Sequence, residues 1–158
     1  MIPRVYALAD THLSFGRPDR DMVRFGERWR DHPEKIRRHA EETVAPEDLL
    51  LLPGDLSWAT KRREALPDLA FLASLPGRKV CIRGNHDFWW EGDRPVGHPG
   101  LEAPPLVVGT LGIAGTRGWQ TPRSGTEATD RRLLERERHR LARSLAAIAE
   151  CPRKLAML

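Results

Sequence analysis

The first half of the chain alternates three short apolar runs with two helical segments, and this alternation restricts the fold more than any other feature. The apolar runs at 4–9, 49–52 and 79–82 predict buried strands. The segments at about 33–44 and 61–75 between them predict helices with one apolar face. Crossover connections between successive strands are right-handed and give a mostly parallel sheet. We therefore predict an α/β fold.

The second half of the chain predicts a hairpin, a long helix and a last strand. Strands near 106–109 and 111–115 are joined tightly, and a helix over about 127–149 carries an apolar stripe of leucines. The segment 154–158 predicts another strand. The Gly- and Pro-rich residues 91–105 predict a loop without regular structure, either a functional flap or a disordered insertion.

Length and composition limit the class of protein. A length of 158 residues suffices for one domain with a core, and we predict a single domain over 1–158. No run of about 18 apolar residues is present, so we expect no membrane span or membrane partner. Two cysteines do not make a disulfide framework, and the first residues lack a signal-peptide pattern, so we predict a cytoplasmic location. The formal charge of +4 leaves nucleic acid open as a partner. It does not indicate nucleic-acid binding, because glutamates are interspersed among the basic residues of the long helix.

Polar side chains follow each of the first three predicted strands. Asp10 and His12 follow the first strand, Asp55 the second, and Asn85 and His86 the third. The carboxyl ends of parallel strands are where open α/β sheets place their ligands. Alternate residues at a strand end point to the same side, so we expect Asp10 and His12 to meet one metal ion. Asp55 is placed to bridge this ion to a second, and Asn85 to give the second a carbonyl oxygen.

The predicted ligands are oxygen and nitrogen atoms, which suit Mn, Fe, Zn, Co or Mg rather than a thiolate site. Two such ions about 3.5–4 Å apart can activate water and hold the oxygens of an in-line phosphoryl displacement. His86 would then donate a proton to the leaving oxygen or stabilise charge on the phosphoryl group. Each motif alone is commonly an ordinary capped turn, but their joint occurrence after successive strands favours the metal interpretation.

Three of these motifs resemble those of a known superfamily. The patterns D-x-H at 10–12, G-D at 54–55 and G-N-H-D at 84–87 resemble the first three motifs of the calcineurin-like metallophosphoesterases. In the last pattern an amide, an imidazole and a carboxylate stand side by side. The neighbouring tryptophan-containing sequences resemble a bacterial branch of predicted phosphohydrolases, and the resemblance spans nearly the whole chain. It implies a β-sandwich flanked by helices, the metallo-dependent phosphatase fold.

The resemblance also implies roles for individual residues. Asp10, His12, Asp55 and Asn85 would be metal ligands, with Asp55 bridging two divalent ions, manganese among the candidates. His86 would be the catalytic histidine, and Asn85 and His86 would contact the substrate. The implied substrate is a phosphate ester.

The sequence departs from the family pattern at two places. Relatives continue with a histidine after a late strand and then a Gly-His-x-His motif, which complete both metal sites. The chain reaches Leu158 where the first of these would follow, and His98 and His139 do not match, so we expect a C-terminally truncated form of the fold. Many relatives also carry an aspartate that orients the catalytic histidine, His86 here, at the position of Trp58.

We therefore predict a phosphoesterase that hydrolyses a phosphomonoester or a phosphodiester through a dinuclear metal centre. One alternative is a truncated or degenerate non-catalytic relative that acts as a phosphate-ligand or protein-binding module. Another is a homo-oligomer in which a second copy supplies the missing ligands.

Four tryptophans follow the strand ends near the predicted site: Trp58, Trp89, Trp90 and Trp119. They are placed either to stack on an aromatic group of a substrate or to pack the surrounding loops. Packing is the commoner role for such side chains, and we favour it here.

Overall fold

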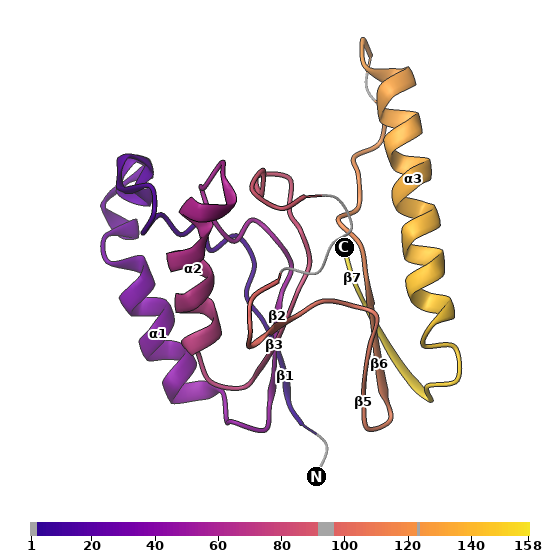
Figure 1. Cartoon of the computed structure of the whole chain (residues 1–158), viewed down its shortest axis with the longest axis horizontal. Coiled ribbons are helices and arrows are strands. Elements are labelled where there is room, and N and C mark those ends of the chain that lie inside the picture. The colour runs from indigo at the N-terminus through magenta and orange to yellow at the C-terminus, as the bar shows by residue number, and fades with distance from the viewer. Residues whose placement is uncertain (1–2, 92–96, 123) are drawn as a thin grey trace. The chain divides into compact units, whose positions relative to one another are not determined.

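The structure is a computed structural model that describes residues 3–91, 97–122 and 124–158. The chain divides into two compact units, Met1–Glu102 and Ala103–Leu158. Each unit contains one sheet with helices beside it (Figure 1), so the predicted α/β class with two sheets flanked by helices is confirmed. A single domain over 1–158 stays a prediction.

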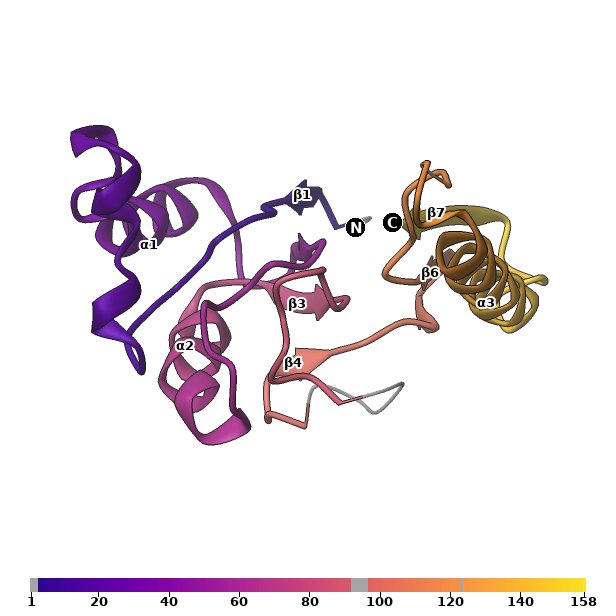
Figure 2. The ribbon, with the colours of Figure 1, turned by 90° about the horizontal axis from the view of Figure 1, so that it is seen from above.

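The first unit is built on a four-stranded sheet in the order β1-β2-β3-β4, in which every neighbouring pair is parallel. The strands are β1 (Val5–Ala7), β2 (Leu49–Leu52), β3 (Arg78–Cys81) and β4 (Leu101–Glu102). The predicted helices are confirmed as α1 (His32–Thr43) and α2 (Arg62–Ser74). Both lie on the same side of this sheet (Figures 1 and 2). Short 3₁₀ turns at Pro18–Arg20, Met22–Phe25 and Glu27–Trp29 connect β1 to α1.

The core of the first unit lies between the sheet and its helices. All four leucines of β2, the strand between β1 and β3, are at most 4% exposed, so side chains on both faces of this strand are buried. Leu69 and Leu72 of α2 are fully buried against it. Trp89 and Trp90 belong to the same core, at 2% and 4% exposure, which confirms the packing interpretation for these two side chains.

The second unit is a three-stranded sheet with one helix. Its elements are β5 (Leu106–Val108), β6 (Leu111–Gly115), α3 (Glu127–Ala146) and β7 (Arg153–Met157). The predicted hairpin is confirmed, since β5 and β6 are antiparallel, and β7 returns parallel to β6 after α3. Gly112 allows a close approach here, because a Cβ at this position would lie 2.7 Å from Cβ of the buried Ile148.

The expectation of an irregular loop over 91–105 is wrong at its C-terminal end. β4 pairs with β3 there, and the guanidinium of Arg78 holds the carboxylate of Glu102 with contacts of 2.5 and 2.8 Å. A two-residue strand has no periodicity of its own, so only its non-local pairing defines it. Residues 92–96 of the expected flap lie outside the described residues.

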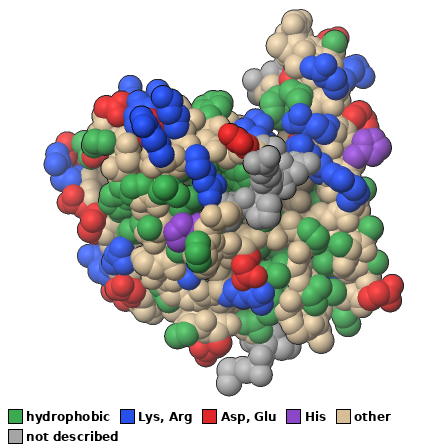
Figure 3. Space-filling view, in the orientation of Figure 1, with side chains coloured by type: hydrophobic (Ala, Val, Ile, Leu, Met, Phe, Trp, Pro, Cys, Tyr) green, Lys and Arg blue, Asp and Glu red, His purple; other side chains and the backbone are tan. Residues whose placement is uncertain are grey.

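The long helix α3 carries charges of both signs. Basic side chains gather over it with acidic ones among them on the face that Figure 3 shows. Arg138 pairs with Glu135 at 2.7 Å and Arg140 with Glu137 at 2.5 Å, in each case within one turn. The exposed Arg138–Glu135 pair agrees with a solvated helix face rather than a continuous basic surface, whereas Glu137 is buried. Within the part of the chain that the structure describes, no helix is long and apolar enough to cross a membrane.

Candidate metal centre

Three loops lie side by side where β1, β2 and β3 end. The loop after β1 runs along the loop after β2, with hydrogen bonds from Asp10 N to Gly54 O (3.2 Å) and from His12 N to Asp55 O (2.9 Å). The backbone N–H of His86, in the third loop, donates to Oδ1 of Asp55 at 2.8 Å. The parallel topology therefore brings all three sequence motifs to one edge of the sheet, as predicted.

Two glycines make this close approach feasible. Gly54 has φ +91°, and a Cβ there would lie 2.6 Å from the Cα of Gly84. A Cβ on Gly84 would lie 2.1 Å from Oδ1 of Asp55. Side chains at either position would push the second and third loops apart. The glycines of the G-D and G-N-H-D patterns are thus explained by backbone contact around Asp55.

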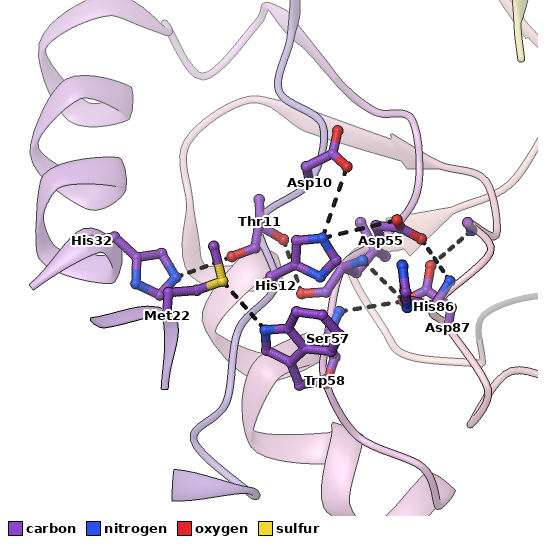
Figure 4. A network of polar contacts seen from close by, with 12 residues as sticks. Asp10, Thr11, His12, Met22, His32, Asp55, Ser57, Trp58, His86 and Asp87 are labelled. Atoms are coloured by element: carbon purple, nitrogen blue, oxygen red, sulfur yellow. Dashed lines mark hydrogen bonds and ion pairs between the residues drawn. The ribbon is translucent and has the colours of Figure 1, made fainter. Parts of the chain in front are cut away.

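Asp10, His12 and Asp55 converge on one point. One ligand atom of each lies within 4.8 Å of the others. Nε2 of His12 is 3.8 Å from Oδ1 of Asp10 and 3.9 Å from Oδ2 of Asp55 (Figure 4). Such separations exceed hydrogen-bond lengths and suit atoms that share a cation about 2.0–2.2 Å from each. Two carboxylates and an imidazole are a donor set for Mn, Fe, Zn or Co, so these residues fit a divalent metal ion.

The backbone at this cluster is left-handed. Asp10, His12 and Asp55 have φ of 55°, 42° and 52°, and among the described non-glycine residues only Asp31, at 54°, shares this feature. Each such conformation costs of the order of 1 kcal/mol or more and persists only where the surrounding structure enforces it. The predicted reason for the convergence, alternation along a strand, is wrong, because β1 ends at Ala7 and left-handed turns aim the side chains instead.

The imidazole of His12 is held in a largely buried position. Its ring stacks on Trp58, with centroids 4.3 Å apart and planes at 17°, and the indole Nε1 of Trp58 donates to Sδ of Met22 at 3.3 Å. Burial lowers the pKa of His12, and the Asp55 carboxylate offsets part of this effect. Nδ1 is buried and lacks a hydrogen-bond partner among the described residues, whereas Nε2 faces the carboxylates. A neutral ring is the form that ligates metals.

His86 and Asn85 lie in the third loop beside the cluster. The ring of His86 is edge-on to His12 at 5.5 Å and to Trp58 at 5.2 Å. Asn85 precedes it and is exposed. The structure thus brings the predicted catalytic histidine next to the Asp10–His12–Asp55 cluster, while the roles of Asn85 and His86 stay predictions.

Asp87, the carboxylate of the G-N-H-D pattern, does not face solvent beside His86. It is fully buried and accepts hydrogen bonds from both sides of the site. Its Oδ1 receives N–H groups from Leu56 (2.9 Å), Ser57 (3.3 Å) and the indole of Trp89 (3.1 Å), and its Oδ2 receives that of Gly84 (2.8 Å). Burial raises the pKa of Asp87, and the backbone N–H donors, which favour the carboxylate, offset part of this rise. Asp87 therefore joins the second and third loops, a role that the sequence pattern did not indicate.

Asp68 of α2 is a second buried carboxylate that sequence reasoning missed. It accepts the hydroxyl of Ser57 and, at 2.8 Å, the backbone N–H of Phe15. Burial raises its pKa to about 6. Asp68 anchors the first and second loops to the helix. The sequence does contain a signal for this buried carboxylate, because Asp68 lies within the apolar stripe of α2.

The fold and the site define an α/β protein with a candidate divalent-metal cluster at the carboxyl ends of parallel strands. The sequence model of the calcineurin-like phosphoesterase family matches residues 3–133, and the chain belongs to this family. Members of the family typically bind divalent metals, and the Asp10–His12–Asp55 cluster lies within the matched region.

One solved structure with similarity to this chain is that of AQ665, a protein of unknown function from Aquifex aeolicus. The similarity covers 86% of this chain and 72% of that one, at 21% sequence identity and a TM-score of 0.47. No curated protein matches this chain significantly.

Proposed function

We propose that this protein is a metal-dependent phosphoesterase that uses two divalent cations, Mn²⁺ among the candidates, to hydrolyse a phosphomonoester or phosphodiester. The observation that carries the proposal is the convergence of Asp10, His12 and Asp55, with His86 at its border. Membership of a phosphoesterase family supports the reaction class.

Each residue of the site would have its own role in binding or catalysis. Oδ2 of Asp55 faces His12, while Oδ1 is held by the backbone N–H of His86, which fixes the carboxylate between the second and third loops. Bound cations would supply Lewis acidity toward the phosphoryl oxygens and a lower pKa for bound water. His86 would hold the phosphoryl group and give a proton to the leaving oxygen. The exposed amide of Asn85 would serve the second cation and the substrate.

The small number of metal donors in the cluster makes a non-catalytic role the second candidate. In the described part of the chain, the cluster contains three His, Asp or Glu residues, and a second cation needs more donors than Asn85 alone. A chain with this set would bind a phosphate ligand or a partner protein without turnover, unless a second copy completes the site.

Metal content and turnover test the proposal together. Protein purified without chelator is assayed by elemental analysis and, with added Mn²⁺, for hydrolysis of p-nitrophenyl phosphate and bis-p-nitrophenyl phosphate. Asp10→Asn is the test variant and Asp31→Asn the matched control, because both aspartates are exposed and have left-handed backbones but only Asp10 belongs to the cluster.

We expect metal binding and hydrolysis of one or both substrates, with both lost in Asp10→Asn and kept in Asp31→Asn. Metal and phosphate binding without turnover would favour the phosphate-binding module. Wild-type metal content in Asp10→Asn would show that the cluster is not the metal site.

A further inference from the structure

Exposed aromatic rings border the metal cluster, and no step of the proposed hydrolysis uses them. We infer that the substrate carries a flat aromatic group next to its phosphate, and that this group binds against Phe25 and Phe88. The inference rests on the proposed function and specifies its substrate class.

The aromatic rings form a continuous series of contacts through the site. Phe25 lies nearly parallel to Trp58, with planes at 19° and centroids 6.3 Å apart, and Trp58 stacks on His12. The ring of Phe88 is perpendicular to that of His86, at 6.2 Å, and His86 is edge-on to Trp58. The series therefore runs from Phe25 through the cluster to Phe88.

The two ends of this series are open to solvent. Phe25 is 55% exposed and Phe88 is 60% exposed, although Trp89 and Trp90, directly after Phe88, are buried in the core. Exposed apolar side chains that gather at one site are typical of a ligand-binding surface. Both belong to segments that contact the surroundings of the cluster, since Phe88 N donates to His86 O at 2.8 Å and Phe25 ends the turn whose Met22 accepts the indole N–H of Trp58.

The positions of these rings define what they can bind. A phosphate bound through cations at Asp10, His12 and Asp55 would lie beside His86 and Trp58, whose rings Phe88 and Phe25 contact. Rings stack or meet edge to face with other rings, and a flat ligand gains contacts that a flexible alkyl chain does not. A nucleobase and an aryl group share this chemistry. Trp58 is less available, because His12 covers one face and Met22 accepts its N–H.

Binding measurements separate ring recognition from turnover. Isothermal titration calorimetry with Mn²⁺ present compares benzylphosphonate with propylphosphonate, and AMP with ribose 5-phosphate. The members of each pair carry the same kind of phosphorus group and differ in the ring or base. Any phosphate ester that is hydrolysed, including benzyl and propyl phosphate, is compared by kcat/KM instead. The variants are Phe25→Ala, Phe88→Ala and their combination, and Phe15→Ala is the control, because Phe15 is 46% exposed and its ring contacts Phe71 rather than the cluster.

We expect the wild type to prefer the ring-bearing member of at least one pair by about tenfold or more, the range of base–aromatic stacking. Phe25→Ala and Phe88→Ala should each lose part of this preference and the double variant most of it, while affinity for the ringless member changes less than twofold and Phe15→Ala behaves as wild type. A preference in the benzyl pair alone assigns an aryl group, and a preference in the AMP pair a nucleobase.

Equal affinity within both pairs would overturn the inference, as would a preference that survives in the double variant. Failure of the proposed function gives a different experimental result. It appears as absence of turnover and of metal in the wild type, whereas failure of the inference appears as absence of ring preference with metal bound.

Discussion

Replacement of Asp87 by asparagine tests how the loops around the metal cluster are held. The carboxylate receives three N–H groups on Oδ1 and that of Gly84 on Oδ2. In Asp87→Asn the amide oxygen can take the place of Oδ1, but the amide NH₂ then faces the N–H of Gly84. The opposite rotamer is worse, because it presents NH₂ to three donors.

The magnitude follows from this count. Two buried donors without an acceptor cost about 1–3 kcal/mol each. Because burial raises the pKa of Asp87, removing the charge relieves a desolvation cost that offsets part of the loss. We therefore expect a fall of about 2–4 kcal/mol in the free energy of unfolding. Affinity for Mn²⁺ should fall by about tenfold or more, the usual effect of losing a residue that positions metal ligands.

Asp48→Asn is the matched control. Asp48 is also buried and divides its oxygens between two backbone donors, Arg4 N and Ala45 N, but it precedes β2 at the opposite end of the strand. This variant should lose stability of the same order and keep the affinity for Mn²⁺. Urea unfolding gives the free energies, and calorimetric titration gives the Mn²⁺ affinities. If the free energy of unfolding of Asp87→Asn lies within about 0.5 kcal/mol of the wild-type value and its affinity for Mn²⁺ is unchanged, Asp87 does not hold the site.

Three further predictions concern the same site. Gly84→Ala should abolish metal binding, because its Cβ would lie 2.1 Å from Oδ1 of Asp55. Gly109→Ala is the control and should lose only stability, because Gly109 has a positive φ but open space around it. Elemental analysis of both variants measures the bound metal. With a folded pKa of about 6 for Asp68 against the usual 3.8, the native state holds a proton that the unfolded state releases. The contribution of Asp68 to stability should therefore rise as pH falls from about 6 to 4, by about 3 kcal/mol at most. Urea unfolding at each pH measures it as the difference in free energy of unfolding between the wild type and Asp68→Asn. Dialysis against a chelator should lower the Tm, and added Mn²⁺ should restore it, since a ligand that binds only the native state stabilises it; an unchanged Tm would contradict a bound metal.

Local patterns in the sequence predicted the elements of the fold and the motifs of the site. Four consecutive leucines at 49–52 identify a buried strand, because successive side chains point to opposite faces and a run of four is buried only where both faces are covered. The order of strands and helices then brings the three polar motifs to one edge of the sheet. For the same reason Asp10, His12 and Asp55 could be grouped without coordinates.

The remaining features depend on contacts between residues far apart in the chain. The left-handed backbone of Asp10 and His12 is held by pairing with the second loop. Asp and His favour this conformation more than other residues do, but the preference is too weak to predict it at a given position. The inward position of Asp87 depends on donors about 30 residues earlier, at Leu56 and Ser57. β4 exists only through its register with β3.

The most direct test of the metal centre is an anomalous difference map from crystals of the protein grown with Mn²⁺. The account predicts a manganese peak about 2.0–2.3 Å from Nε2 of His12 and from a carboxylate oxygen of both Asp10 and Asp55. Absence of a peak at these three residues in crystals that contain manganese elsewhere would contradict it.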